Sequence, residues 1–184
     1  MTRLPYPGPA GDEAARDVEQ RIASERGKVL AIYRMLLHAP GIADGWRHLL
    51  TEVRRDAELP GRLREMVIMR VAALNRAVYE AEHHHAIAVR EGVSELQLQR
   101  LAASGPLDRR SLADAGFTDD ELDVLALTES LTADVRVDDN VFARVADRLG
   151  PRQVVELVVT IAAYNMVSRF LVALGIEFEP PVEG

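Results

Sequence analysis

The chain of 184 residues contains no cysteine. A protein without thiols cannot form disulfide bonds, bind a metal through thiolates or use a cysteine nucleophile. Aromatic residues make up only 5% of the sequence, and Lys28 is the single lysine among 22 basic residues. With 48% hydrophobic residues, the chain is still long enough to form one domain with a buried core.

An excess of positive charge is also lacking. The net charge is −7, which argues against nucleic-acid binding, because phosphate contacts need a basic face. The N-terminus has no apolar segment typical of secretory signals, and Glu156, Asn165 and Arg169 interrupt the longest apolar stretch, residues 154–174. These features predict a cytoplasmic protein with no membrane partner. Its many arginines are compatible with an anionic substrate.

No stretch alternates between apolar and polar residues over the length of a strand, so the sequence predicts an all-α protein. The expected helices cover residues 11–38 with an interruption at Gly27, 42–57, 61–74, 76–91, 94–104, 118–133, 138–149 and 152–174. Residues 105–115 are expected to form a turn-rich connector, and Asn75 is expected to separate the two central helices. Two capping-box patterns support helix starts: Ser94 with Gln97, and Thr118 with Glu121.

Composition divides the chain into three parts. Residues 1–10 carry three prolines and should form an extended arm, residues 11–176 a single all-α domain, and residues 177–184 an acidic tail. Aligning Glu65 with Glu156 superposes two apolar helices. This alignment favours an internal duplication with a degenerate second half, although two unrelated apolar helices could also match by chance.

One short stretch contains the densest group of ionisable side chains: Glu80, Glu82, His83, His84 and His85. Four-residue spacing on a helix places Glu80 and His84 on one face, where a carboxylate can orient an imidazole and select its tautomer. In the preceding helix, Glu65 is followed by four apolar residues that would bury it. A buried carboxylate needs a partner or a proton, so Glu65 joins the candidate site.

These residues resemble the carboxymuconolactone decarboxylase family, which includes the alkylhydroperoxidase D-like proteins. The resemblance rests on Glu65 in an apolar helix, Tyr79 followed by Glu80, His84 four residues later, and Gly92 followed by valine and serine. It implies an all-α bundle of the alkylhydroperoxidase D-like type. It also implies a homo-oligomer, as a dimer, trimer or hexamer.

The peroxidase branch of this family carries C-x-x-C before the histidine, and the corresponding positions here are Ala77 and Glu80. Peroxide reduction requires a thiolate and a resolving thiol, so peroxidase activity is not expected. The branch without these cysteines includes the decarboxylase itself. The resemblance therefore implies a lyase or isomerase without a cofactor or metal, which acts on a small carboxylated lactone or related ring compound. His84 would donate a proton, Glu80 would orient it, and Glu65 would hold a proton through burial.

Three further residues are candidates for substrate binding. Tyr79 and His83 belong to the cluster, and His38 precedes Ala39 and Pro40 in a segment that also resembles the family. Each has a structural alternative, because Tyr79 can simply pack and His38 can cap the preceding helix. In the last helix, Tyr164 has the same two interpretations.

Two other functions remain open from the sequence. One is a non-catalytic or stress-associated oligomer that keeps the fold with an idle pocket. The other is a metal-dependent enzyme, because Glu80 and His83 have the spacing found in di-iron bundles. Di-iron bundles need this pattern twice, and the second half of the chain has no copy. Zinc would need Glu65 to lie close to Glu80 and His84.

Overall fold

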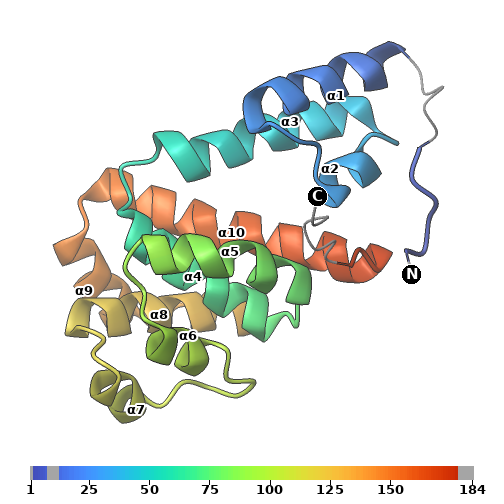
Figure 1. Cartoon of the computed structure of the whole chain (residues 1–184). Helices are drawn as coiled ribbons and strands as arrows, with labels where there is room; N and C mark the ends of the chain where they lie inside the picture. Colours follow the sequence, from blue (N-terminus) through green and yellow to red (C-terminus); the bar gives the residue numbers. More distant parts are fainter. Residues whose placement is uncertain (1, 8–12, 178–184) are drawn as a thin grey trace.

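A computed structural model describes residues 2–7 and 13–177 (Figure 1). These residues form helices and no strand, so the predicted all-α class is confirmed. The helices are α1 (Glu13–Arg26), α2 (Ala31–Leu36), α3 (Pro40–Thr51), the π-helical turn η1 (Glu52–Asp56), α4 (Gly61–Leu74), α5 (Val78–Arg90), α6 (Glu95–Leu101), α7 (Arg109–Asp114), α8 (Asp119–Ala133), α9 (Asp139–Arg148) and α10 (Pro151–Leu174). Apart from Glu177, the predicted acidic tail lies outside the described residues, as do residues 8–10 of the predicted arm.

The predicted helix breaks at Gly27 and Asn75 are confirmed. Gly27 lies between α1 and α2 with a φ of 76°, a conformation that glycine adopts without steric cost. Asn75 is the C-cap residue of α4, and its side-chain amide donates to the carbonyl of Val71 and to Asn165 in α10. The break between α4 and α5 is therefore fixed to the last helix by a 2.9 Å hydrogen bond between the two asparagines.

Two predictions of local structure are wrong in part. Residues 105–115 contain the short helix α7, which begins where Asp108 accepts a hydrogen bond from the backbone N–H of Ser111. Six residues are too few to show helical periodicity, so the sequence pattern missed this helix. The helix expected over residues 42–57 changes after Thr51 into η1, whose wider turn has no simple signature in the sequence.

Helix α4 lies at the centre of the fold and packs against α5, α8 and α10. All eight residues from Glu65 to Ala72 are buried, including the charged side chains of Glu65 and Arg70. Figure 1 shows α1, α2 and α3 at one end of the molecule, above the level of α5 and α10. This arrangement encloses the N-terminal half of α5 between α4, α10 and the first helices.

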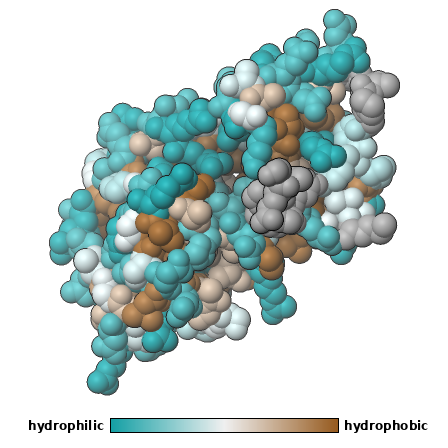
Figure 2. All heavy atoms as spheres, viewed as in Figure 1, coloured by the Kyte–Doolittle hydropathy of each residue, from teal (hydrophilic) through white to brown (hydrophobic). Residues whose placement is uncertain are grey.

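Helix α10 is the one helix among residues 2–7 and 13–177 with the length and composition of a membrane span. Half of its apolar window is buried within the fold, and the core helix of a soluble protein meets the same criterion. Its buried side chains join two apolar clusters, one with α1 to α3 and the other with α4, α8 and α9. Figure 2 shows a largely hydrophilic face of the molecule, interrupted by smaller apolar patches.

Candidate active site

The three residues predicted to be catalytic come together in the core between α4, α5 and α10. His84 is 3% exposed, and its Nδ1 lies 2.6 Å from Oε2 of Glu65. Its Nε2 lies 3.3 Å from Oε2 of Glu80 and 3.2 Å from the hydroxyl of Tyr164. One buried imidazole is therefore held between two carboxylates, with a tyrosine beside the nitrogen that faces Glu80.

Glu65 is held as a carboxylate. Burial would raise its pKa, but the hydrogen bonds from His84 and from Nε of Arg64, at 3.1 Å, outweigh burial, so the pKa lies below its ordinary value. An ionised carboxylate only accepts hydrogen bonds, so Nδ1 of His84 carries the hydrogen. Glu65 thereby fixes the tautomer and leaves Nε2 as the atom that exchanges a proton with a ligand.

Glu80 has the opposite electrostatic character. Its burial raises its pKa above the ordinary value, despite the opposing influence of His84 and Arg54, and the negative charge of Glu65 adds to the rise. The sequence-based expectation was the reverse, with Glu80 as the orienting carboxylate and Glu65 as the protonated group. The structure differs because Glu65 receives two hydrogen bonds from basic side chains, whereas Glu80 has no arginine at bonding distance in the described residues.

Glu80, His84 and Tyr164 line a narrow pocket, named here the inner cavity, together with Leu30, Ile32, Tyr33, Leu50, Arg54, Tyr79, His83 and Val167. Tyr164 is fully buried, and burial holds its pKa well above the ordinary value, so its hydroxyl stays protonated. Tyr33 is also buried with a raised pKa, and its hydroxyl has no hydrogen-bond partner within the described part of the chain. The inner cavity thus offers two neutral hydroxyl groups and one protonatable carboxyl group.

A larger outer cavity of about 410 Å³ adjoins the inner one. Arg54, His83, Leu30 and Leu50 line both. Glu65 reaches the outer cavity from α4, and the other lining residues come from the end of α1, the loop before α2, η1 and α5. A volume of this size suits a small organic ligand.

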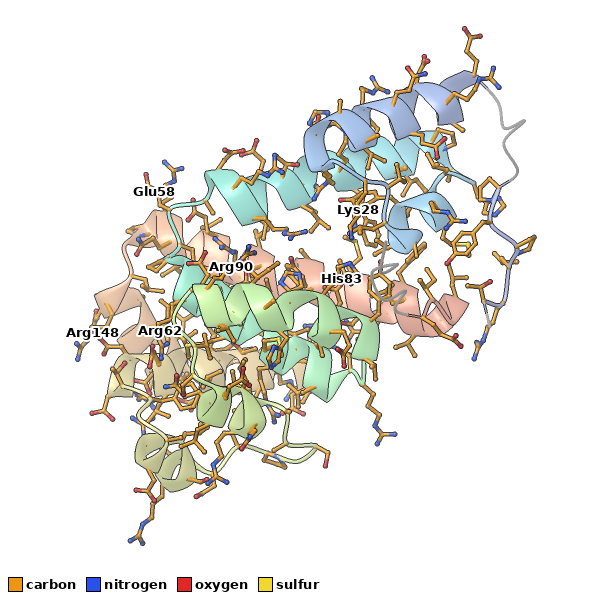
Figure 3. The ribbon with its side chains drawn as sticks, viewed as in Figure 1. Lys28, Glu58, Arg62, His83, Arg90 and Arg148 are labelled. Carbon is orange, nitrogen blue, oxygen red and sulfur yellow. The ribbon has the colours of Figure 1, made fainter. Side chains whose placement is uncertain are left out.

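The predicted substrate-binding residues have different fates. Tyr79 is buried in the wall of the inner cavity and stacks on the ring of His83, with ring centroids 4.6 Å apart. His83 lines both cavities, and Figure 3 shows it on the side of α5 that faces Lys28. His38, in contrast, is exposed, bonds the carbonyl of Pro5 through Nε2 and lines neither cavity.

The geometry does not fit the zinc alternative. Glu65 and Glu80 approach opposite nitrogens of one imidazole ring, so the three side chains do not converge on one point. A metal bound at Nε2 would have Glu80 but not Glu65 as a neighbour, and structural and catalytic zinc sites use at least three protein ligands. No group of three or more histidine, aspartate or glutamate side chains in residues 2–7 and 13–177 is arranged to hold a metal ion.

His83 should make the stability of the protein sensitive to acid. Burial, the nearby charge of His84 and that of Lys28 lower its pKa from 6.5 to about 4. The unfolded chain therefore takes up this proton first, and stability is lost as pH falls from about 6.5 towards about 4. We expect His83→Gln to reduce the loss of unfolding free energy between about pH 7 and about pH 4, measured by urea denaturation. The exposed neighbour His85, replaced by glutamine, is the matched control, and an unchanged pH dependence in His83→Gln would contradict this assignment.

Several residues of the site were not identified from the sequence. Arg54, Arg64 and Tyr33 contact or line it, but none belongs to a motif. Arg54 lies in η1, and the departure from α-helical geometry that aims it at the cavity cannot be read from a hydrophobic pattern. Tyr164, whose role was ambiguous from the sequence, lies against His84 with the two rings perpendicular.

Comparisons with known proteins agree with this architecture. The model of the carboxymuconolactone decarboxylase family matches residues 40–106, which include Glu65, Tyr79, Glu80 and His84. No curated protein matches the chain in sequence.

Solved structures are similar over the whole fold. A peroxidase-related protein from Silicibacter sp. TM1040 has a TM-score of 0.79 at 14% identity, over 100% of this chain and 94% of that one. An alkylhydroperoxidase AhpD core protein from Ralstonia eutropha JMP134 has a TM-score of 0.77 at 17% identity, over 98% and 93%. The debrominase Bmp8, in complex with 2,3,4-tribromopyrrole, has a TM-score of 0.72 at 15% identity, over 98% and 94%. Residues 40–106 therefore belong to the carboxymuconolactone decarboxylase family, and the chain as a whole has the alkylhydroperoxidase D-like fold without its cysteines.

Proposed function

We propose that the protein is a cofactor-free lyase or isomerase that uses Glu and His acid–base chemistry on a small carboxylated lactone or related ring compound. The observation that carries this proposal is the buried imidazole of His84 between an ionised Glu65 and a proton-holding Glu80, next to a cavity rich in basic residues. Because the chain has no cysteine, a thiol peroxidase reaction is excluded. The debrominase with its bound tribromopyrrole supports a small ring compound as the ligand class of this fold.

In a decarboxylation, the bond between the ring carbon and the carboxylate breaks and CO₂ leaves. The electron pair stays on the substrate as a dienolate, and the ring carbon then takes a proton from Nε2 of the His84 imidazolium. Glu80, 3.3 Å from Nε2, supplies the proton that converts His84 to this form, and solvent reprotonates Glu80 afterwards. Glu65 stabilises the imidazolium through Nδ1 at 2.6 Å, and the Tyr164 and Tyr33 hydroxyls can donate to the enolate oxygen.

We also propose that the protein is a cytoplasmic homo-oligomer with a small anionic substrate. Helix α10 supports self-association, because it exposes Val155, Met166 and Val172 along its length while its other face fills the core. Exposed apolar side chains on a core helix are typical of subunit interfaces.

The direct test is CO₂ release from 4-carboxymuconolactone by the purified protein. We expect turnover by the wild type and a loss of at least about 10²-fold in His84→Gln, because general acid catalysis contributes on that scale. His85→Gln, one residue away and exposed, should retain full activity. Absence of turnover in the wild type would overturn the decarboxylase assignment and favour an idle pocket within the same fold.

A further inference from the structure

The outer cavity concentrates positive charge in an acidic protein. The chain has a net charge of −7, yet this cavity is lined by six basic residues and two acidic ones. The basic residues are Arg26, Lys28, Arg54, Arg55, Arg64 and Arg90. Like charges repel at this range, so the cluster is unfavourable unless anions compensate it.

Three of the six cations are used by the protein itself. Arg26 donates to the carbonyl of Arg47 and to Thr51, and Arg55 donates to the carbonyl of Glu25. Arg64 pairs with Glu65 at 3.1 Å and with Glu91 at 3.7 Å, and these are the two acidic residues of the cavity. The carboxylates are thus already neutralised by one arginine.

Arg54, Lys28 and Arg90 differ from these three, because none forms a hydrogen bond or an ion pair with another residue in the described part of the chain. Lys28 and Arg90 are exposed at the rim, and Figure 3 shows both on the side of α5 that faces the first helices. Arg54 is half-buried and lines both cavities. A half-buried guanidinium has lost part of its hydration without a protein hydrogen bond in return.

The π-helical turn η1 accounts for the position of Arg54. Its neighbour Val53 is buried in the core and Arg55 is directed to α1, so the wider turn leaves Arg54 on the side of Tyr33, Glu80 and Tyr164. Such turns cost helical regularity and are found frequently at functional sites. Here the turn places a guanidinium between the space where a ligand would bind and the proton-transfer groups.

We propose that the outer cavity is an anion-binding subsite for a small ligand with at least two anionic groups, each a carboxylate or a phosphate. Arg54 binds the group next to the inner cavity, and Lys28 with Arg90 binds the second group at the rim. One monoanion would leave most of the excess positive charge uncompensated, which is why a polyanion fits better. The proposal rests on the proposed function for the ligand's orientation, and it names Arg54 as the residue that determines substrate specificity.

Binding can be tested without turnover. Isothermal titration calorimetry at constant ionic strength would compare succinate and pyrophosphate, each with two anionic groups, with acetate. We expect saturable binding of at least one dianion, at least tenfold tighter than acetate. The arm that binds more tightly distinguishes a carboxylate from a phosphate ligand. Arg54→Gln should weaken dianion binding at least tenfold, whereas Arg110→Gln, an exposed arginine of α7 outside the cavity, should bind as the wild type does.

The proposal is overturned if neither dianion binds saturably, or if Arg54→Gln binds them as tightly as the wild type. Thermal unfolding would verify that Arg54→Gln is folded. If it is not, the double variant Lys28→Gln with Arg90→Gln changes only exposed residues and should also weaken dianion binding at least tenfold. Dianion binding by a protein that does not release CO₂ from 4-carboxymuconolactone would leave the subsite in place and refute the reaction alone.

Discussion

Replacing Arg70 with methionine is expected to lower the free energy of unfolding by about 3–5 kcal/mol, because it removes one partner of a buried ion pair. Arg70 is fully buried in α4 and pairs with Glu129 of α8. Its guanidinium also donates to three backbone carbonyls after α6, those of Leu101, Ala103 and Gly105. Methionine fills a similar volume but leaves the carboxylate and the carbonyls without these donors.

Urea denaturation at neutral pH would measure this loss. The exposed Arg110→Met is the matched control, and its effect should stay within about 0.5 kcal/mol. Adding Glu129→Gln to Arg70→Met should recover part of the stability, since the uncompensated negative charge is then removed. A loss below about 1 kcal/mol in Arg70→Met would show that the network contributes little to the fold.

Isosteric replacement of the two carboxylates around His84 should change stability in opposite directions at neutral pH. Glu65→Gln is expected to lower the free energy of unfolding by about 1–3 kcal/mol, because it weakens charge-assisted hydrogen bonds with His84 and Arg64. Glu80→Gln should leave stability unchanged or raise it by up to about 1 kcal/mol, because its charged form is disfavoured by burial.

The pH dependence of these two variants follows from the directions of the pKa shifts. The pKa of Glu65 is lowered by folding, so its contribution is present above the unfolded pKa and is lost as pH falls. The pKa of Glu80 is raised, so its cost is present at neutral pH and disappears once the carboxyl is protonated. Urea denaturation of both variants at about pH 7 and about pH 4 should therefore show both differences shrinking in acid.

Turnover separates a working site from a relic. Both variants should lose at least about 10²-fold in activity if the proton relay operates, including Glu80→Gln, which should be no less stable than the wild type. Equal destabilisation by the two substitutions would instead mean that the carboxylates are electrostatically equivalent, contrary to the structure.

Most of the helices were predictable because each depends on short-range patterns. Apolar side chains at helical spacing, Gly27 with a positive φ, and the capping box of Ser94 with Gln97 all act within a few residues of sequence. The pairing of Glu80 and His84 on one face of α5 is equally local. Helix α7 and the turn η1 escaped prediction, because one is too short for periodicity and the other departs from it.

The sequence by itself determined the all-α class, the absence of thiol chemistry and the presence of Glu65, Glu80 and His84 as one group of ionisable residues. Only the tertiary structure decided which carboxylate is ionised. That choice depends on Arg64, on burial by α10 and on the 2.6 Å bond from His84 to a residue 19 positions earlier. It also excluded His38 from the site and brought in Arg54 and Tyr164. These outcomes arise from long-range packing, in which desolvation and charge partners are set by residues distant in sequence.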